Sequence, residues 1–225
     1  MKPQIVKVYS HTRSGTHFLE AFITENFYSN LDFSIKPITW GHWSNRKIKE
    51  EGNPYGKIFG NHLFPPNIND SSRKVYIKRD GRAVAYSMWK TPNFIHKNLK
   101  NISFQDFLEL KIDWIGTPSN KANPDLTILE HWCKHVRSWE YYERINDNTL
   151  IVRYEDLIDN PYEQYLKIYK KFFNYKKLLT KDEITIIDKP VGLLPNMAKV
   201  DSWKEEFNKS NNEMYFNVLS KYNCQ

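Results

Sequence analysis

The sequence predicts an α/β fold in a single domain, with a parallel β-sheet flanked by helices. Short β-branched runs alternate with segments of helical period, which is the order of βαβ units. A chain of 225 residues suits one large domain, so we expect residues 1–225 to form it. The composition, 40% hydrophobic and 15% aromatic, supplies a core and excludes a disordered chain.

The first predicted unit is a strand, a polar loop and a helix. Residues 4–9 are a short β-branched run that stops at a polar turn with one glycine, residues 10–16. From His17 to Tyr28 the apolar residues recur on one helical face. The loop between them is large enough to hold a phosphate.

The later elements continue the alternation. Strands are predicted at 57–64, 73–79 and 149–154, and helices at 81–89, 104–114, 126–145 and 162–173. Pro161 suits the first turn of the last of these helices. From Thr180 the pattern is mixed, and we expect this part to pack across the surface. Residues that follow the strands, at 10–17, 61–64, 79–82 and 154–156, are expected to converge at one edge of the sheet.

The charge balance predicts an anionic partner. Lys and Arg number 33 against 26 Asp and Glu, a net charge of +7. The basic residues form no block, so a nucleic-acid partner is not expected. No stretch reaches ~18 unbroken apolar residues and the first residues have no apolar signal region, so no membrane association is expected. Two cysteines, Cys133 and Cys224, fit a reducing compartment, and we expect the cytoplasm.

The loop after the first strand is a candidate phosphate site. Backbone N–H groups of Ser14, Gly15, Thr16 and His17 precede or begin a helix, where anions are favoured, and Arg13 adds a charged clamp. The nucleoside-triphosphate pattern GxxxxGK[ST] is not met, because its first Gly and its Lys are missing. On its own, the loop is equally compatible with an ordinary turn and a Ser/Thr helix cap.

A second candidate phosphate site follows the third strand. Arg79 ends that strand and Ser87 lies eight residues on, in the second turn of the next helix. The Arg offers a forked contact and the Ser a hydroxyl. The plainer alternative is a salt-bridged Arg and a solvent-facing Ser.

Five segments in order resemble the sulfotransferases that use 3′-phosphoadenosine 5′-phosphosulfate (PAPS). SHTRSGTHFL is similar to the family's 5′-phosphosulfate loop, and IKRDGRAVAYS to its 3′-phosphate motif. The family segment that carries the catalytic histidine is similar to NHLFP. A helix motif of the family is similar to HVRSW, and a motif at the end of a strand is similar to RYEDL. The matches run from residue 5 to about residue 173.

The resemblance implies a fold like that of P-loop nucleotide kinases. It also implies the transfer of a sulfuryl group from PAPS to a hydroxyl or amine of an acceptor, in a reaction that requires no metal ion. PAP, the desulfated nucleotide, would be the product. His62 would be the general base, for which a neutral imidazole with a pKa near ~6.5 is suited. Arg13 would stabilise the leaving phosphate. The donor would be bound by Arg13, Ser14, Gly15, Thr16, His17, Phe18, Arg79, Ser87 and Tyr154. The acceptor, a small molecule or a glycan, is not identified.

The chain departs from the family pattern at two places, which keep alternatives open. Gly60 stands where a Lys usually precedes the catalytic His. Of the family's C-terminal RKGxxGDWK segment only Trp203 and Lys204 remain, and Lys199 is expected to replace part of the 3′-phosphate clamp. A PAPS-binding protein without turnover, a P-loop kinase and a basic nucleic-acid binder are the alternatives. His131 and His135 have metal-ligand spacing, but no third ligand accompanies them, so no metal is predicted.

Overall fold

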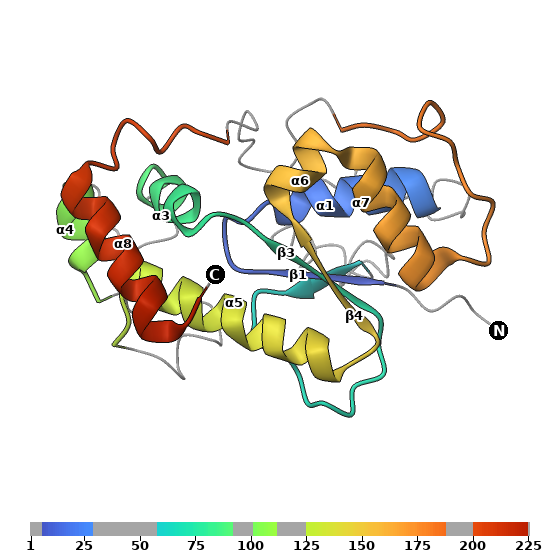
Figure 1. Ribbon diagram of the computed structural model, residues 1–225, viewed down its shortest axis with the longest axis horizontal. Coiled ribbons are helices and arrows are strands. Elements are labelled where there is room, and N and C mark those ends of the chain that lie inside the picture. The colour runs from blue at the N-terminus through green and yellow to red at the C-terminus, as the bar shows by residue number, and fades with distance from the viewer. Residues whose placement is uncertain (1–5, 29–57, 92–100, 112–124, 188–199, 225) are drawn as a thin grey trace, which may run out of the picture.

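Four parallel strands form the centre of the computed structural model, which describes residues 6–28, 58–91, 101–111, 125–187 and 200–224 (Figure 1). Their order across the sheet is β2-β1-β3-β4. Their bounds are β1 Lys7–Ser10, β2 Phe59–Asn61, β3 Lys74–Lys78 and β4 Thr149–Arg153. The predicted parallel α/β sheet is therefore confirmed.

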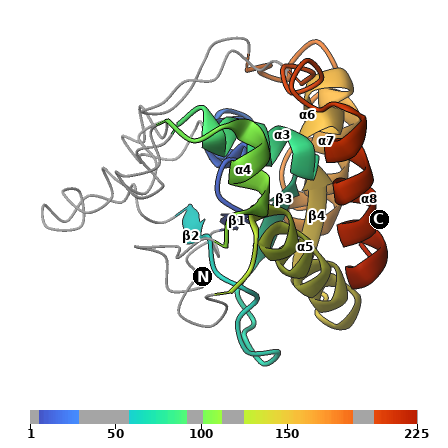
Figure 2. The same cartoon turned by 90° about the vertical axis from the view of Figure 1, so that its left-hand side faces the viewer.

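Helices cover both faces of the sheet (Figures 1 and 2). One face carries α1 Thr16–Ile23 with its π-helical continuation Thr24–Tyr28, α6 Tyr154–Asp159, and α7 Pro161–Ile168 with its π-helical continuation Tyr169–Phe173. The other face carries α3 Gly81–Trp89, α4 Phe104–Glu109, α5 Ile128–Ile145 and α8 Lys209–Tyr222. Among these helices, none combines the length and the hydropathy that crossing a membrane requires.

The two faces of the sheet have separate cores because side chains alternate along each strand. In β3, Val75 and Ile77 pack with α1, α6 and α7, whereas Tyr76 packs with α3 and α5. All three side chains are fully buried. The near-continuous apolar strand seen in the sequence is thus explained by burial on both faces.

Several predicted elements differ in length from those observed. The second strand is confined to Phe59–Asn61, and the helix predicted from Phe104 ends at Glu109. Helix α6 was not predicted, because its six residues are too few to show a period. From Thr180 onward we expected no regular element, and this expectation was wrong for α8, a helix of 14 residues. Its buried positions are only Asn211 and Tyr215, so its apolar period is weak.

The two cysteines lie together although neither forms a disulfide. Cys133 on α5 and Cys224 after α8 are both buried and free, and their thiols hydrogen-bond to each other. This contact adds to the packing that holds α8 against α5.

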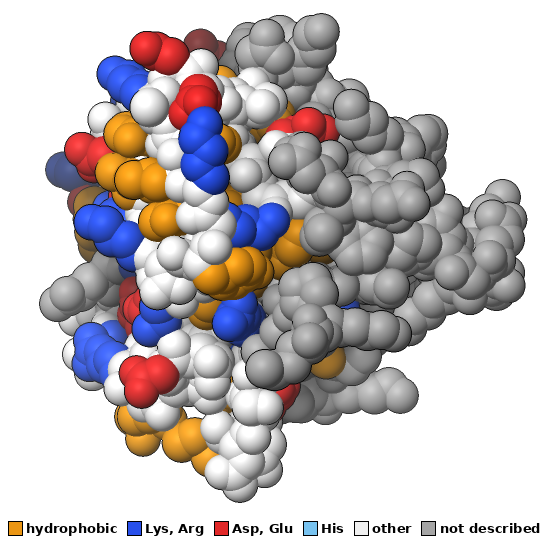
Figure 3. Space-filling view, turned by 90° about the vertical axis from the view of Figure 1, so that its right-hand side faces the viewer, with side chains coloured by type: hydrophobic (Ala, Val, Ile, Leu, Met, Phe, Trp, Pro, Cys, Tyr) orange, Lys and Arg blue, Asp and Glu red, His pale blue; other side chains and the backbone are white. Residues whose placement is uncertain are grey.

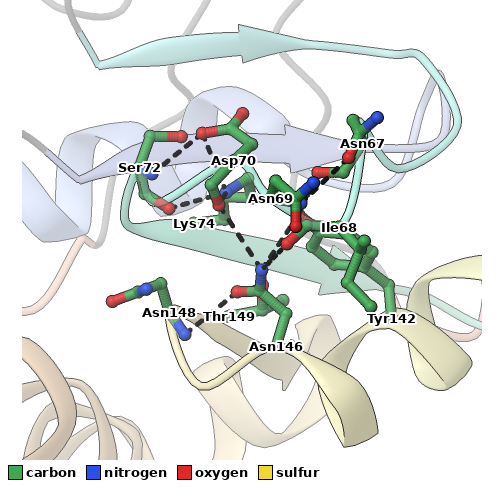
Figure 4. Close-up of polar contacts among 10 residues, drawn as sticks. All are labelled: Asn67, Ile68, Asn69, Asp70, Ser72, Lys74, Tyr142, Asn146, Asn148 and Thr149. Carbon is green, nitrogen blue, oxygen red and sulfur yellow. Dashed lines mark hydrogen bonds and ion pairs between the residues drawn. The ribbon is translucent and has the colours of Figure 1, made fainter.

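A polar network fixes the edge of the sheet where β3 and β4 begin (Figure 4). The buried Lys74 donates from Nζ to the carbonyl oxygens of Asp70 and Ser72, at 2.9 and 2.6 Å. Asn146 donates to the carbonyl of Ile68 and accepts from the Asn148 N–H, at 3.1 and 3.0 Å. The amino ends of the strands are thereby fixed, and the opposite edge is left for the site.

Candidate functional site

The residues that follow the four strands converge at the carboxyl edge of the sheet, as the sequence predicts. Ser10, at the end of β1, contacts His62, which follows β2. Arg79, which follows β3, places its guanidinium 4.4 Å from the ring centroid of Tyr154, which follows β4. Four segments far apart in the chain therefore form one polar site.

The loop between β1 and α1 has the backbone shape of an anion cradle. Gly15 has a φ of +94°, and a Cβ at this position would overlap the Tyr154 ring, so only glycine fits. Arg13 is also left-handed, with φ 67°. Such turns aim successive N–H groups into one concavity at a helix N-terminus. The Ser14 hydroxyl is buried and has no hydrogen-bond partner among the described residues. An anionic ligand in the loop would accept a hydrogen bond from it.

Two guanidinium groups border this loop, that of the half-buried Arg13 and that of the buried Arg79. Arg13 donates from Nε to the Ser87 hydroxyl at 3.0 Å, and Arg79 donates to the Arg13 carbonyl at 3.3 Å. Burial, followed by the charge of Arg79, lowers the pKa of Arg13. Burial also lowers the pKa of Arg79, against the charges of Tyr154, Glu155 and Asp80. Two neighbouring cations that are partly or fully removed from water favour an anionic ligand.

The turn that carries Arg79 is held from two sides. Trp132 of α5 donates from its indole to the Arg79 carbonyl at 3.1 Å. Glu155 at the start of α6 accepts from the Asp80 N–H at 3.0 Å, and Asp80 caps α3 through the Arg82 N–H. A Cβ at Gly81 would come within 2.7 Å of the Trp132 ring. The expected structural role of Glu155 agrees with these contacts.

His62 is oriented by a residue at the end of β1. Its Nδ1 lies 3.0 Å from both the carbonyl oxygen and the hydroxyl of Ser10. A carbonyl only accepts, so Nδ1 carries the hydrogen and Nε2 holds the lone pair in the neutral ring. Burial, opposed by the hydrogen bond to the Ser10 backbone and aided by the charge of His17, lowers the pKa of His62 to about 4. This pKa lies below the ordinary histidine value expected from the sequence, and the ring is neutral at pH 7.

Three more histidines, fully buried, lie beneath the site. His11 Nε2 is 3.0 Å from His131 Nδ1. His135 donates from Nε2 to the Leu63 carbonyl at 2.9 Å, while its Nδ1 accepts from the Tyr76 hydroxyl at 2.9 Å. Burial lowers the pKa of His131 to about 4 and that of His135 to about 3. Of these rings, His135 holds the backbone at and just after His62.

His131 and His135 are thus engaged with protein groups. Among the described residues, no three His, Cys, Asp or Glu side chains are arranged to hold a metal ion.

The first turn of α1 adds further polar and aromatic groups. The Thr16 hydroxyl lies 2.6 Å from the Ser10 hydroxyl, which links the loop to His62. His17 Nδ1 lies 3.0 Å from a carboxylate oxygen of Glu20. Phe18 meets Tyr154 edge to face, with ring centroids 5.7 Å apart. The expected grouping of Phe18 and Tyr154 is therefore observed, although Tyr154 begins a helix rather than ending a strand.

The C-terminal residues expected near the 3′-phosphate are Lys199, Trp203 and Lys204. Lys199 lies outside the described residues. Trp203 packs on the Arg82 guanidinium at 3.9 Å, and Lys204 pairs with Asp201 at 2.8 Å, so both have structural contacts. Sequence reasoning placed residues 10–17 at this edge but assigned no role to Ser10 or His11, whose position at the start of the polar turn was the available signal.

Comparisons with known proteins agree with this geometry. A family model described as "Sulfotransferase domain" matches residues 3–191. A mouse sulfotransferase complexed with PAP is structurally similar, with a TM-score of 0.61, 19% identity, and coverage of 99% of this chain and 85% of that chain.

Two structures of retinol dehydratase are also similar, each covering 99% of this chain. The complex with androsterone and PAP has a TM-score of 0.56, 18% identity and 81% coverage of that chain. The complex with retinol and PAP has a TM-score of 0.58, 17% identity and 82% coverage of that chain. No curated protein matches by sequence.

Proposed function

The chain belongs to the sulfotransferase domain family, and on that premise we propose that it transfers a sulfuryl group from PAPS to a hydroxyl or amine of an acceptor. The observation that carries the proposal is the pair of guanidinium groups of Arg13 and the buried Arg79, which hydrogen-bond to Ser87 and to the Arg13 carbonyl respectively, beside a loop with an unpartnered buried hydroxyl. A nucleotide with phosphates at both its 5′ and 3′ positions matches two cationic places in one site.

In this proposal the donor lies across the carboxyl edge of the sheet. The N–H groups of the loop from Ser14 to His17, with Arg13, hold the 5′-phosphosulfate. Arg79 and Ser87 hold the 3′-phosphate, with Lys199 assigned to the same phosphate. Phe18 and Tyr154 flank the adenine. Residues 1–225 act as one domain.

The reaction is an in-line displacement at sulfur. The acceptor oxygen or nitrogen forms a bond to sulfur while the bond from sulfur to the 5′-phosphate oxygen breaks, and PAP departs with that electron pair. His62 Nε2 accepts the proton of the acceptor, because Nδ1 is engaged by Ser10. Arg13 stabilises the charge that develops on the leaving phosphate oxygen. The chain supplies base, cation and oriented N–H groups.

We assign the acceptor to the class of small molecules or glycans that present a hydroxyl or amine. This assignment is supported by Phe64, which follows His62 in the chain and provides an apolar ring on the same side of the site. The ring centroids of Phe64 and His135 are 5.0 Å apart. Androsterone and retinol are the small molecules in the similar retinol dehydratase complexes. An acceptor screen with labelled PAPS identifies the acceptor.

Thermal unfolding with PAP, 5′-AMP or ATP tests the donor assignment. PAP should stabilise the protein far more than 5′-AMP, by about 2.7 kcal/mol at ~100 times its dissociation constant. Equal shifts with PAP and 5′-AMP contradict the assignment of Arg79 and Ser87. A strong PAP shift without transfer of label to any acceptor indicates a binding protein without turnover.

A further inference from the structure

Two thiols that the proposed reaction does not use meet between α5 and α8. Cys133 lies in α5, and Cys224 is the second residue beyond α8. Both are free, and both belong to the same hydrophobic core, with Cys133 fully buried and Cys224 5% exposed. A hydrogen bond joins the two sulfur atoms. The fold thus brings together two cysteines that are far apart in the sequence.

The backbone after α8 fixes the position of Cys224. Asn223 is left-handed, with φ 50°, and the Cys224 N–H donates back to the Leu219 carbonyl at 2.9 Å. The Asn223 N–H donates to the Ser220 carbonyl at 3.2 Å. These two bonds form a Schellman motif, in which a left-handed residue ends a helix and turns the next residue back along it. The end of α8 lies beside α5, so this turn places Cys224 on Cys133 (Figures 1 and 2).

The surroundings of the pair give the two thiols different reactivity. The hydrogen bond from Cys133 lowers the pKa of Cys224, against burial and the charge of Glu140. Lys78 and Arg137, which pair with Glu140 at 2.7 and 3.3 Å, lower it as well. The same hydrogen bond and burial raise the pKa of Cys133. Because the thiolate is the reactive form of cysteine, Cys224 is the thiol that an oxidant attacks first.

The two cysteines also differ in access. The last turn of α8 contacts α5 through the Lys221–Glu130 ion pair, in which Lys221 is 62% exposed. Exposed pairs of this kind contribute little to stability, and helix ends open more easily than helix centres. A small oxidant therefore reaches Cys224 when the end of α8 opens. Cys133 lies within α5, where opening requires disruption of the core.

We propose that Cys133 and Cys224 form a reversible disulfide that fastens α8 to α5 when the protein meets a peroxide. The Cys224 sulfur bonds to one oxygen of hydrogen peroxide, the O–O bond breaks, and the other oxygen leaves as water with the thiol proton. The resulting sulfenic acid is attacked at sulfur by Cys133; its S–O bond breaks, and a second water leaves with the Cys133 proton. The two sulfurs together lose two electrons, which the peroxide gains. A reducing thiol restores both cysteines.

The disulfide would hold α8 over a residue that supports the candidate site. Trp132, next to Cys133, donates to the Arg79 carbonyl at 3.1 Å. Its ring centroid lies 6.1 Å from that of Tyr215, on α8. Fastening α8 to α5 keeps this ring covered. The disulfide itself goes beyond the proposed function and requires neither a donor nor an acceptor.

Mass spectrometry without reduction tests the disulfide in the whole chain. After treatment with hydrogen peroxide, denaturation and alkylation, wild-type protein should have lost the mass of two hydrogen atoms and should carry no alkyl group on either cysteine. Dithiothreitol should restore both sites. The thermal midpoint of the oxidised protein should rise by about 5–15 °C, because the cross-link closes a long loop in the unfolded chain.

Cys133→Ala and Cys224→Ser are matched variants, since each keeps one thiol and all four methionines. In Cys133→Ala, Cys224 should accumulate as a sulfenic acid that dimedone labels, because the second thiol is missing. In Cys224→Ser, Cys133 should stay a thiol, and peroxide should not raise the thermal midpoint. Circular dichroism of the untreated variants checks their folding, and the wild-type measurement does not depend on them.

Three results would overturn the inference. Both cysteines of peroxide-treated wild-type protein could still take up the alkylating agent, in which case no disulfide forms. A disulfide found only between two chains, on a non-reducing gel, would show that the two sulfurs of one chain do not join. An unchanged or lowered midpoint in the oxidised protein would show that the bond does not fasten α8. PAP binding by the reduced protein tests the donor site separately.

Discussion

At the scale of single residues, the chemistry assigned to His62 depends on which ring nitrogen carries the hydrogen. The Ser10 carbonyl sets this, since it can only accept from Nδ1. The Ser10 hydroxyl connects the same nitrogen to Thr16 in the loop, over 3.0 and 2.6 Å. His62 and the loop after β1 are therefore coupled through one small side chain at the end of β1.

Replacing His62 tests the base. His62→Ala should lower turnover by roughly 10²–10⁴-fold and leave PAP affinity near the wild-type value, because His62 is assigned to the acceptor side. A base must be neutral, so activity is lost only as the pH falls through its pKa, which burial lowers to about 4. In wild-type protein kcat/KM should therefore show no acidic limb near ~6.5, the ordinary histidine value.

Rate measurements from about pH 8 down to the onset of acid unfolding check this prediction. A limb near ~6.5 that disappears in His62→Ala would contradict the lowered pKa but support the base. Normal turnover in His62→Ala would remove His62 from the mechanism. Loss of PAP binding in the same variant would indicate a structural histidine.

Arg79 is the residue that should distinguish PAP from 5′-AMP. Arg79→Ala removes a buried forked cation and should weaken PAP binding about ten- to hundredfold with little effect on 5′-AMP. Arg79→Lys, the matched control, keeps the charge without the fork and should retain part of the preference. Competition binding measures both nucleotides. An unchanged ratio of affinities in Arg79→Ala would assign the 3′-phosphate elsewhere.

At the scale of elements, α5 positions two of the loops at the carboxyl edge. Its indoles at Trp132 and Trp139 donate to the carbonyls of Arg79 and Leu63, and His135 donates to Leu63 as well. These residues are three or four positions apart and so share one helix face. The helix begins with a capping box of Thr127 and Glu130, which fixes its first turn.

The end of α5 offers a test of stability separate from function. Asn146 contacts the carbonyl of Ile68, the Tyr142 hydroxyl, the Asn148 N–H and the Thr149 hydroxyl (Figure 4). Asn146→Ala should lower the free energy of unfolding by about 2–4 kcal/mol, since several buried groups lose partners. Denaturant unfolding measures this change.

PAP affinity should be unchanged in Asn146→Ala, because this network lies at the amino edge of the sheet, opposite the site. Ser138, whose hydroxyl donates to the Lys134 carbonyl within α5, provides a control: Ser138→Ala should have a much smaller effect on stability. Similar losses in the two variants would show that the network is not stabilising.

At the scale of the whole molecule, 33 Lys and Arg against 26 Asp and Glu give a net charge of +7. On the face in Figure 3, Lys and Arg side chains are interspersed with Asp and Glu and with hydrophobic side chains. The described part of that face has no continuous basic surface. By contrast, the interior holds His11, His131 and His135 as neutral groups at most 2% exposed.

These buried histidines should make the fold sensitive to acid. Burial lowers the pKa values of His11, His131 and His135 below 6.5, so the unfolded chain binds protons first as the pH falls. Stability is complete above pH ~6.5 and is lost as the pH falls toward about 4, with a slope of about 5 kcal/mol per pH unit for four groups, since burial lowers the pKa of His62 in the same way. Denaturant midpoints between these pH values measure it.

A variant with one fewer titrating group provides the control. His131→Asn keeps a donor for His11 and should reduce the pH slope by about one proton, whatever its effect on stability at neutral pH. A wild-type stability that is constant between pH ~4 and ~6.5 would show that these rings are protonated in the folded protein as readily as in the unfolded chain.

Sequence alone was sufficient for the alternation of strands and helices, the parallel sheet and the loop after β1. These depend on local patterns: apolar period, a glycine where φ must be positive, and Pro161 at the first position of α7. The grouping of Arg13, Arg79, His62 and Tyr154 was also predictable, because the carboxyl ends of parallel strands share one edge. Helix α8 was missed, since its burial comes from neighbours distant in the chain.

Tertiary structure alone decided the electrostatics of the site. The pKa of His62 depends on its burial and on Ser10, 52 positions away in the chain. The His17–Glu20 spacing is visible in the sequence, but only the fold shows that Glu20 is buried and His17 is not. Spacing along the chain specifies which side chains share a helix face or a strand end. The desolvation of each charge is set by the elements that cover it, and those elements come from the whole chain.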